Sequence, residues 1–203
     1  EGGHYPSIES SWGYHWVAKP LSIQMKKEEA LYYFEAQWSI PMKDNETSNR
    51  AYVSRKMILD TQAKLLLVID EEECGHALTQ NFIIPTKHSN NVYSRFWTNG
   101  EMVTEAIQYS KRYNSLDEGI QLKIRNKKDP IFTCIALEPY SLEKESIPRL
   151  DCPREERGTK IKCKTKSGEL TIYYSPEDIH NGLKYLKDSN GNIVYGRMVA
   201  EKN

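Results

Sequence analysis

The sequence predicts a mainly β protein of the α+β class, built as an antiparallel β-sandwich or flattened barrel of about eight strands with two α-helices. Three observations support this fold class. Short segments alternate apolar and polar residues at a period of two, turn residues separate neighbouring segments, and only two segments carry helix-start signals. With 203 residues and 38% hydrophobic side chains, the chain is long enough to bury a core, so we expect residues 1–203 to form a single domain.

The clearest alternation runs from Ala30 to Ile40, where one face carries apolar residues and the other carries Glu35, Gln37 and Ser39. A second apolar run at 17–25 is joined to it by a charged turn, which predicts a hairpin. The apolar face of the later strand consists of Tyr32, Phe34, Ala36, Trp38 and Ile40.

Three more hairpins are predicted along the chain. Residues 51–59 pair with 64–70, residues 119–125 pair with 131–137, and residues 160–166 pair with 170–174 around Ser167 and Gly168. The final strand is expected at 193–199. Successive hairpins favour antiparallel sheets, hence the sandwich or barrel.

Two helices are predicted, near 99–113 and near 176–188. Thr98 and Glu101 have the spacing of a capping box, and Met102, Val103, Ala106 and Ile107 then follow at helical spacing. For the second helix, Ser175 and Pro176 suit the cap and the first helical position.

Composition excludes several classes of protein. The 28 basic and 28 acidic residues give a formal net charge of zero, which argues against a nucleic-acid binder. The longest apolar run, residues 65–69, is far shorter than the roughly 20 residues of a transmembrane helix. Because no catalytic, dinucleotide or metal-binding motif is recognisable, the sequence predicts no catalytic residues, no cofactor and no metal site.

Four cysteines lack the close spacing of zinc or redox sites, so an even count favours disulfides. Of three possible connectivities we favour Cys152 with Cys163 and Cys74 with Cys134. Asn45 begins a sequon for N-glycosylation in a polar stretch, and the chain does not start with Met. These features predict a secreted or extracellular protein. The alternative is a cytosolic protein with four buried free thiols.

Two basic rows are candidate partner-binding sites. Their side chains alternate with uncharged residues, so each row is expected on one face of a strand, where it could hold an anionic ligand or an acidic protein. The competing explanation is that lysines on edge strands prevent aggregation. The two rows are Lys123, Arg125 and Lys127, and Lys160, Lys162, Lys164 and Lys166.

A ligand pocket is the third candidate site. Aromatic residues offer broad apolar faces with polar edges, and four of them come from segments expected to point into a barrel. Packing of the same side chains into the core is the alternative. The predicted pocket residues are Trp16, Phe34, Trp38 and Trp97.

These features together predict a secreted, non-enzymatic binding protein that recognises a protein partner or a small ligand, such as a factor that sequesters a host molecule. One alternative is a hydrolase with a His and carboxylate centre, because five histidines are spread along the chain. Another is a structural or matrix protein of a particle that uses the basic strand faces. The sequence does not specify an oligomeric state.

Overall fold

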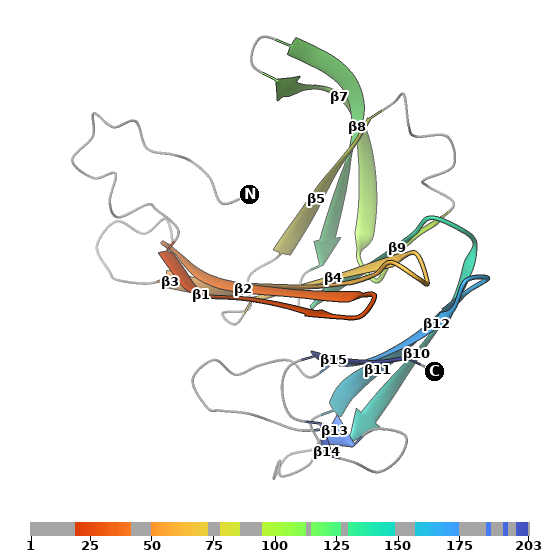
Figure 1. The fold of residues 1–203 in the computed structure, drawn as a ribbon. Coiled ribbons are helices and arrows are strands. Elements are labelled where there is room, and N and C mark those ends of the chain that lie inside the picture. Colours follow the sequence, from red (N-terminus) through yellow and green to blue (C-terminus); the bar gives the residue numbers. More distant parts are fainter. Residues whose placement is uncertain are drawn as a thin grey trace.

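The computed structural model describes ten parts of the chain, and they form a mainly antiparallel β structure, as predicted (Figure 1). The elements in these parts are strands, and no helix in them is long and apolar enough to cross a membrane. The described residues are 19–41, 50–72, 78–85, 95–112, 115–126, 130–148, 157–174, 186–187, 193–194 and 198–202.

A six-stranded sheet with the order β1-β2-β3-β4-β9-β6 lies in the middle of the molecule (Figure 1). Each neighbouring pair in it is antiparallel. Its strands are β1 (Lys19–Glu28), β2 (Leu31–Pro41), β3 (Arg50–Asp60), β4 (Leu65–Glu72), β6 (Phe96–Thr98) and β9 (Ile131–Ala136).

Two further sheets lie on opposite sides of this central sheet, and a short two-stranded ladder pairs β13 (Leu186–Lys187) with β14 (Ile193–Val194). The four-stranded sheet has the order β10-β11-β12-β15 and the three-stranded sheet the order β5-β8-β7. Their strands are β10 (Tyr140–Pro148), β11 (Arg157–Thr165), β12 (Glu169–Tyr174), β15 (Met198–Lys202), β5 (Leu78–Pro85), β7 (Glu101–Arg112) and β8 (Ser115–Asn126).

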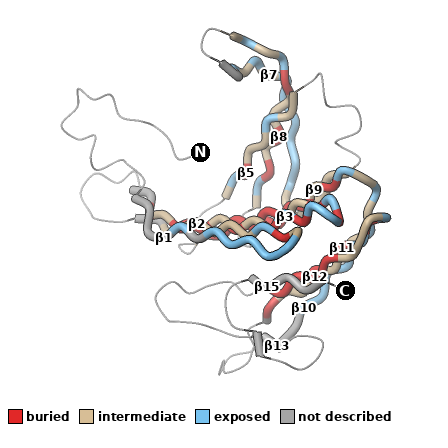
Figure 2. Tube along the Cα trace, viewed as in Figure 1, coloured by how far each residue is buried: buried red, intermediate tan, exposed pale blue. Residues whose placement is uncertain are grey.

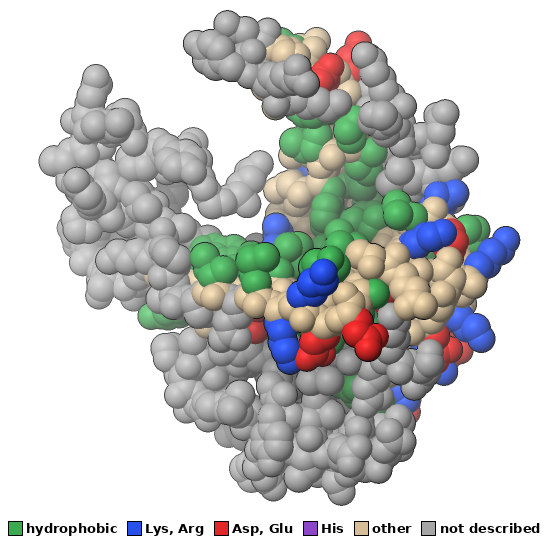
Figure 3. Space-filling view, in the orientation of Figure 1, with side chains coloured by type: hydrophobic (Ala, Val, Ile, Leu, Met, Phe, Trp, Pro, Cys, Tyr) green, Lys and Arg blue, Asp and Glu red, His purple; other side chains and the backbone are tan. Residues whose placement is uncertain are grey.

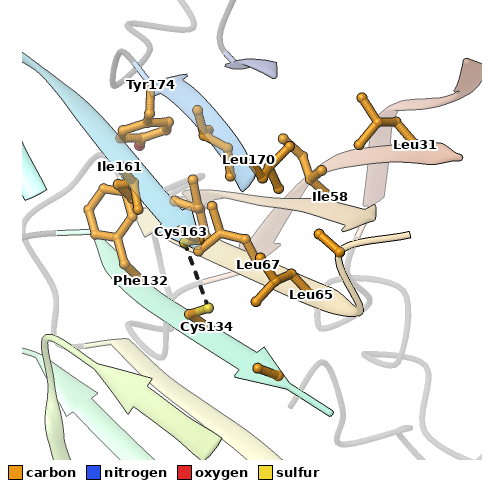
Figure 4. Close-up of a cluster of buried hydrophobic side chains, with 14 residues drawn as sticks. Leu31, Ile58, Leu65, Leu67, Phe132, Cys134, Ile161, Cys163, Leu170 and Tyr174 are labelled. Carbon is orange, nitrogen blue, oxygen red and sulfur yellow. Dashed lines mark hydrogen bonds between the residues drawn. The ribbon is translucent and has the colours of Figure 1, made fainter. Parts of the chain in front are cut away.

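The main core lies between the six-stranded and the four-stranded sheet, which makes this part a sandwich (Figures 2 and 4). Alternate residues of β4, β9, β11 and β12 point into it because side chains change face at every residue of a strand. Phe132 and Tyr174 meet edge to face across this core, with ring centroids 5.1 Å apart. The core residues include Leu65, Leu67, Ile69, Phe132, Cys134, Ile161, Cys163, Leu170, Ile172 and Tyr174.

The three-stranded sheet packs against the opposite face of the central sheet, over β9 and β6. Phe82 of β5 meets Phe96 of β6 edge to face at 5.7 Å. The buried Gln80 bridges the layers, because its Oε1 accepts a hydrogen bond from Thr133 Oγ1 at 2.5 Å and its Nε2 donates to Ile131 O at 3.3 Å. The molecule therefore has three β layers where the central sheet is covered on both faces.

Polar contacts between turns join the sandwich sheets at one end. The Ser167 amide donates to Glu138 Oε1 at 2.8 Å, and Lys64 Nζ lies 3.5 Å from Glu138 Oε2. Thr165 Oγ1 donates to Ala63 O at 2.9 Å. These contacts lower the pKa of Glu138 to about 2, chiefly through the Ser167 hydrogen bond.

The predicted helix near 99–113 is wrong, because Glu101–Arg112 forms strand β7, paired with β8 from Glu101 to Arg112. The Thr98 hydroxyl does accept an amide hydrogen bond, but the donor is Gly100, at 3.1 Å. It thus stabilises the bend between β6 and β7 instead of capping a helix. Of the other predicted helix, near 176–188, only residues 186–187 are described, and they belong to a strand.

The predicted hairpins 17–40, 51–70 and 160–174 are present as β1-β2, β3-β4 and β11-β12. The predicted hairpin of residues 119–125 with residues 131–137 does not form, so this prediction is wrong. β8 pairs with β5 and β7, whereas β9 pairs with β4 and β6, so the chain crosses between layers at this point. Of the predicted final strand, 193–199, residues 193–194 belong to β14 and residues 198–199 to β15, and the residues between them lie outside the described parts.

Replacing Gly100 by Ala should destabilise the protein. A Cβ at Gly100 would lie 2.6 Å from Ile124 Cγ2 and 2.9 Å from the Arg125 carbonyl oxygen. Overpacking of this kind costs about 1–3 kcal/mol, and urea denaturation measures it. Gly168→Ala is the matched control, because its Cβ would meet only Ala63, at 3.5 Å. Equal stability of Gly100→Ala and wild type would contradict this packing.

Glu138→Gln should reduce the loss of stability in acid. The folded-state pKa of Glu138, about 2, lies below its ordinary value of 4.5. The carboxylate therefore stabilises the fold above pH 4.5, and this contribution is lost as the pH falls towards 2. Urea denaturation at pH 6 and at lower pH should show a smaller decrease for the variant than for wild type. Parallel curves for the two proteins would show that Glu138 is not responsible.

Candidate binding surface

The central sheet exposes apolar side chains on the part of its outer face that β1, β2 and β3 form. We call this surface the outer apolar face. It follows from the period of two, because alternate residues of three neighbouring strands point away from the sandwich core. Its residues are Ile23, Met25, Tyr32, Phe34, Ala36, Trp38, Met57 and Leu59.

Strand register brings these side chains together in rows across the sheet. Met25 pairs with Phe34 and Phe34 with Met57, while Tyr32 pairs with Leu59. Directly opposite residues in antiparallel strands point to the same side of the sheet, so each row is a contiguous contact. Figure 3 shows hydrophobic side chains gathered along this face, on the side of the three-stranded sheet.

Exposure distinguishes this surface from ordinary sheet packing. Met25 is 79% exposed, Ile23 65%, Tyr32 41% and Leu59 39%. Scattered apolar residues are common on protein surfaces, but several large ones in adjacent rows are typical of an interaction site.

An ion pair lies within the same face. Arg55 Nε and one Arg55 Nη donate to the two oxygens of Asp70, each at 2.7 Å. Asp70 is buried and Arg55 is partly exposed. The hydrogen bond to Asp70 raises the pKa of Arg55. The guanidinium therefore stays protonated, and the Asp70 carboxylate balances its charge.

The four predicted pocket residues do not meet at one place. Phe34 and Trp38 lie on the outer apolar face. Trp97 pairs with Cys134 and packs against the sandwich core, on the opposite face of the same sheet. Trp16 lies outside the described residues. The period of two correctly put Phe34 and Trp38 on one face of β2, but that face points away from the sandwich core instead of inward as expected. The face on which Trp97 lies depends on its pairing with β9.

The predicted basic row of β11 does share one face, but acidic side chains lie beside it. Lys162 Nζ is 2.8 Å from Glu169 Oε1, and this contact raises the pKa of Lys162. Lys160 Nζ is 3.9 Å from Glu145 Oε2. Lys164 pairs across the strands with Ser141 and Glu169, and Lys166 lies in the following turn. Positive charge on this face is therefore interleaved with negative charge.

The second basic row lies on β8, in a different sheet from β11. Lys123 Nζ is 2.6 Å from Glu105 Oε2, and Arg125 is opposite Glu101 in the strand register. Lys127 lies outside the described residues, as do Asn45, Cys74 and Cys152. The structure does not join the two basic rows into one patch.

A buried polar cluster is the feature that sequence reasoning missed. Lys56, fully buried on β3, forms an ion pair with Glu71 of β4 and lies 3.3 Å from Ser54 Oγ. Ser54 Oγ donates to Glu71 Oε1 at 2.8 Å, and the Tyr174 hydroxyl donates to Glu71 Oε2. The only sign of this cluster in the sequence was the period of two, which puts Ser54 and Lys56 on the same inward face of the strand as Ile58.

This cluster joins the two sheets of the sandwich rather than offering a reaction centre. Serine next to lysine can serve nucleophilic catalysis, but a substrate must reach the hydroxyl. Ser54 is 1% exposed and Lys56 0%, so neither side chain meets solvent. Within the described ranges, no group of three or more His, Cys, Asp or Glu is arranged to hold a metal ion.

No family model, no curated protein and no solved structure matches this chain.

Lys56→Met should destabilise the protein by about 3–5 kcal/mol, because it leaves the buried Glu71 carboxylate without its cation. Lys56→Met combined with Glu71→Gln should recover part of this loss, since the second change removes the unpaired charge. Urea denaturation of the single and double variants gives the coupling energy.

Lys160→Met is the matched control, because Lys160 is partly exposed and its ion pair is long. Its effect should stay below about 1 kcal/mol. If Lys56→Met were no more damaging than Lys160→Met, the buried ion pair would not stabilise the sandwich.

Proposed function

We propose that this protein is a non-enzymatic binding protein that recognises a protein partner through the outer apolar face. The observation that carries the proposal is the exposure of Ile23, Met25, Tyr32 and Leu59 in adjacent rows of one sheet surface. When a partner covers such a surface and removes it from water, the complex is stabilised by about 25 cal/mol for each Å² of apolar area buried.

Composition favours a protein as the occupant. Aromatic residues, Met and Arg are enriched at the centres of protein interfaces, and this face combines Tyr32, Trp38, Met25, Met57 and Arg55. Small ligands instead favour concave pockets that bury most of their surface. The face is the pleated surface of three neighbouring strands, so it suits a broad partner.

The charged residues of the outer apolar face favour a partner whose contact surface is apolar. Arg55 is already paired with Asp70, so the partner needs no carboxylate at the centre. Lys27 lies at the margin, with its Nζ 5.2 Å from the centre of the Tyr32 ring. The two lysine rows, interleaved with acids, are weaker candidates for an anionic partner.

A secreted or extracellular setting and the sequestration of a host molecule belong to the same proposal. The extracellular setting is supported by the even number of cysteines and by the sequon at Asn45. In such a setting the partner is a protein with an exposed apolar patch.

Met25→Lys should weaken partner binding without unfolding the protein, because Met25 is mostly exposed and its replacement places a charge in the apolar interface. Affinity capture from extracellular fluid with wild type and variant identifies proteins that depend on Met25. Calorimetric titration of a purified protein from that set should then show at least about tenfold weaker binding by the variant, or 1.4 kcal/mol.

Leu116→Lys is the matched control, because Leu116 is 70% exposed and lies on β8, outside this face. It should bind like wild type. Recovery of the same proteins by Met25→Lys and wild type would refute the proposal. So would a wild-type dimer that Met25→Lys dissociates in sedimentation, since the occupant would then be a second copy.

A further inference from the structure

Cys134 and Cys163 face each other across the sandwich core. Cys134 lies on β9 of the central sheet and Cys163 on β11 of the four-stranded sheet, and both are buried free thiols in this structure. Their sulfur atoms are 4.0 Å apart, and the dashed line in Figure 4 joins them. Leu67 is the strand neighbour of Cys134, and Leu170 that of Cys163, so the two thiols meet in an apolar layer.

Other roles for the two thiols fit the surroundings less well. A structural zinc site takes four ligands, and no third metal-binding side chain joins the pair in the described part of the chain. A reactive cysteine needs exposure and a stabilised thiolate. Here the neighbouring Cys163 and burial both raise the pKa of Cys134.

We propose that Cys134 and Cys163 form a disulfide that joins the two sheets of the sandwich when the protein folds in an oxidising compartment. This inference is independent of the partner proposed above. It changes the connectivity favoured from sequence spacing, in which Cys134 pairs with Cys74 and Cys163 with Cys152.

The chemistry is thiol–disulfide exchange with a low-molecular-weight disulfide, such as oxidised glutathione, as the oxidant. One protein thiolate attacks the oxidant, forming a mixed disulfide and releasing one glutathione thiol. The second protein thiolate attacks the protein sulfur of the mixed disulfide and releases the other glutathione. The two cysteines lose two protons and two electrons, and the oxidant becomes two thiols.

Bond formation requires a modest movement. The sulfur atoms must approach by about 2 Å to reach a covalent S–S length. A disulfide can join the two sheets of a β-sandwich, as it does in antibody domains. Because both thiols are buried in the folded sandwich, we expect the bond to form during folding, before the core excludes the oxidant.

Peptide mapping tests the pairing directly. The protein is refolded in a glutathione redox buffer, denatured, alkylated without reductant and digested with trypsin. The expected product is peptide 129–144, which contains Cys134, linked to peptide 163–164, which contains Cys163. Alkylation of both residues, or a link from either one to Cys74 or Cys152, would overturn the proposal.

The variant Cys74→Ser/Cys152→Ser provides a second test, because it retains only the proposed pair. Its intact mass should rise by about 2 Da on reduction, the mass of two hydrogens. Reduction should also lower its melting temperature by roughly 10 °C, because the bond closes a loop of moderate length. Cys134→Ala/Cys163→Ala added to this background is the control without cysteines, and reductant should not affect it. A variant with the pair intact that behaves like the control would refute the bond.

Discussion

Burial of the central sheet on both faces is the constraint on which the rest of the structure depends. β9 is buried at five of its six residues, and β4 at six of its eight. Such strands cannot alternate apolar with polar residues, and the run from Leu65 to Ile69 has the continuous apolar pattern that two-sided burial requires. The four-stranded sheet covers one face of these strands, and the three-stranded sheet packs over the other.

Polar side chains inside these layers are accommodated by partners from another strand or layer. Lys56 and Glu71 form an ion pair, and the Tyr174 hydroxyl of the four-stranded sheet donates a hydrogen bond to Glu71. Gln80 of β5 likewise forms hydrogen bonds to β9. Burial of an unpaired polar group is costly, so each contact favours one relative placement of the sheets over shifted alternatives.

Alternation in the sequence predicted β2 and β11 as strands with one apolar and one polar face. In β11 the apolar face meets the sandwich core, as expected. In β2 the polar face, with Gln37 and Ser39, is the buried one, and the apolar face, with Phe34 and Trp38, points away from that core. The pattern failed at β7, where Met102, Val103 and Ile107 fit either a helix or a strand, and pairing with β8 decided the outcome. The contacts of Trp97, Lys56 and Cys134 depend on residues distant in sequence, which no local period reveals.

The layered arrangement has a consequence for how the molecule opens. The three-stranded sheet is held mainly through Gln80, Phe82 and their neighbours on β9 and β6, and β7 at its edge is exposed along most of its length. Regions with few buried contacts open first in native-state fluctuations. Backbone amides of β7 should therefore exchange with deuterium early, whereas the amides of β4 and β9 should exchange only when the whole sandwich unfolds.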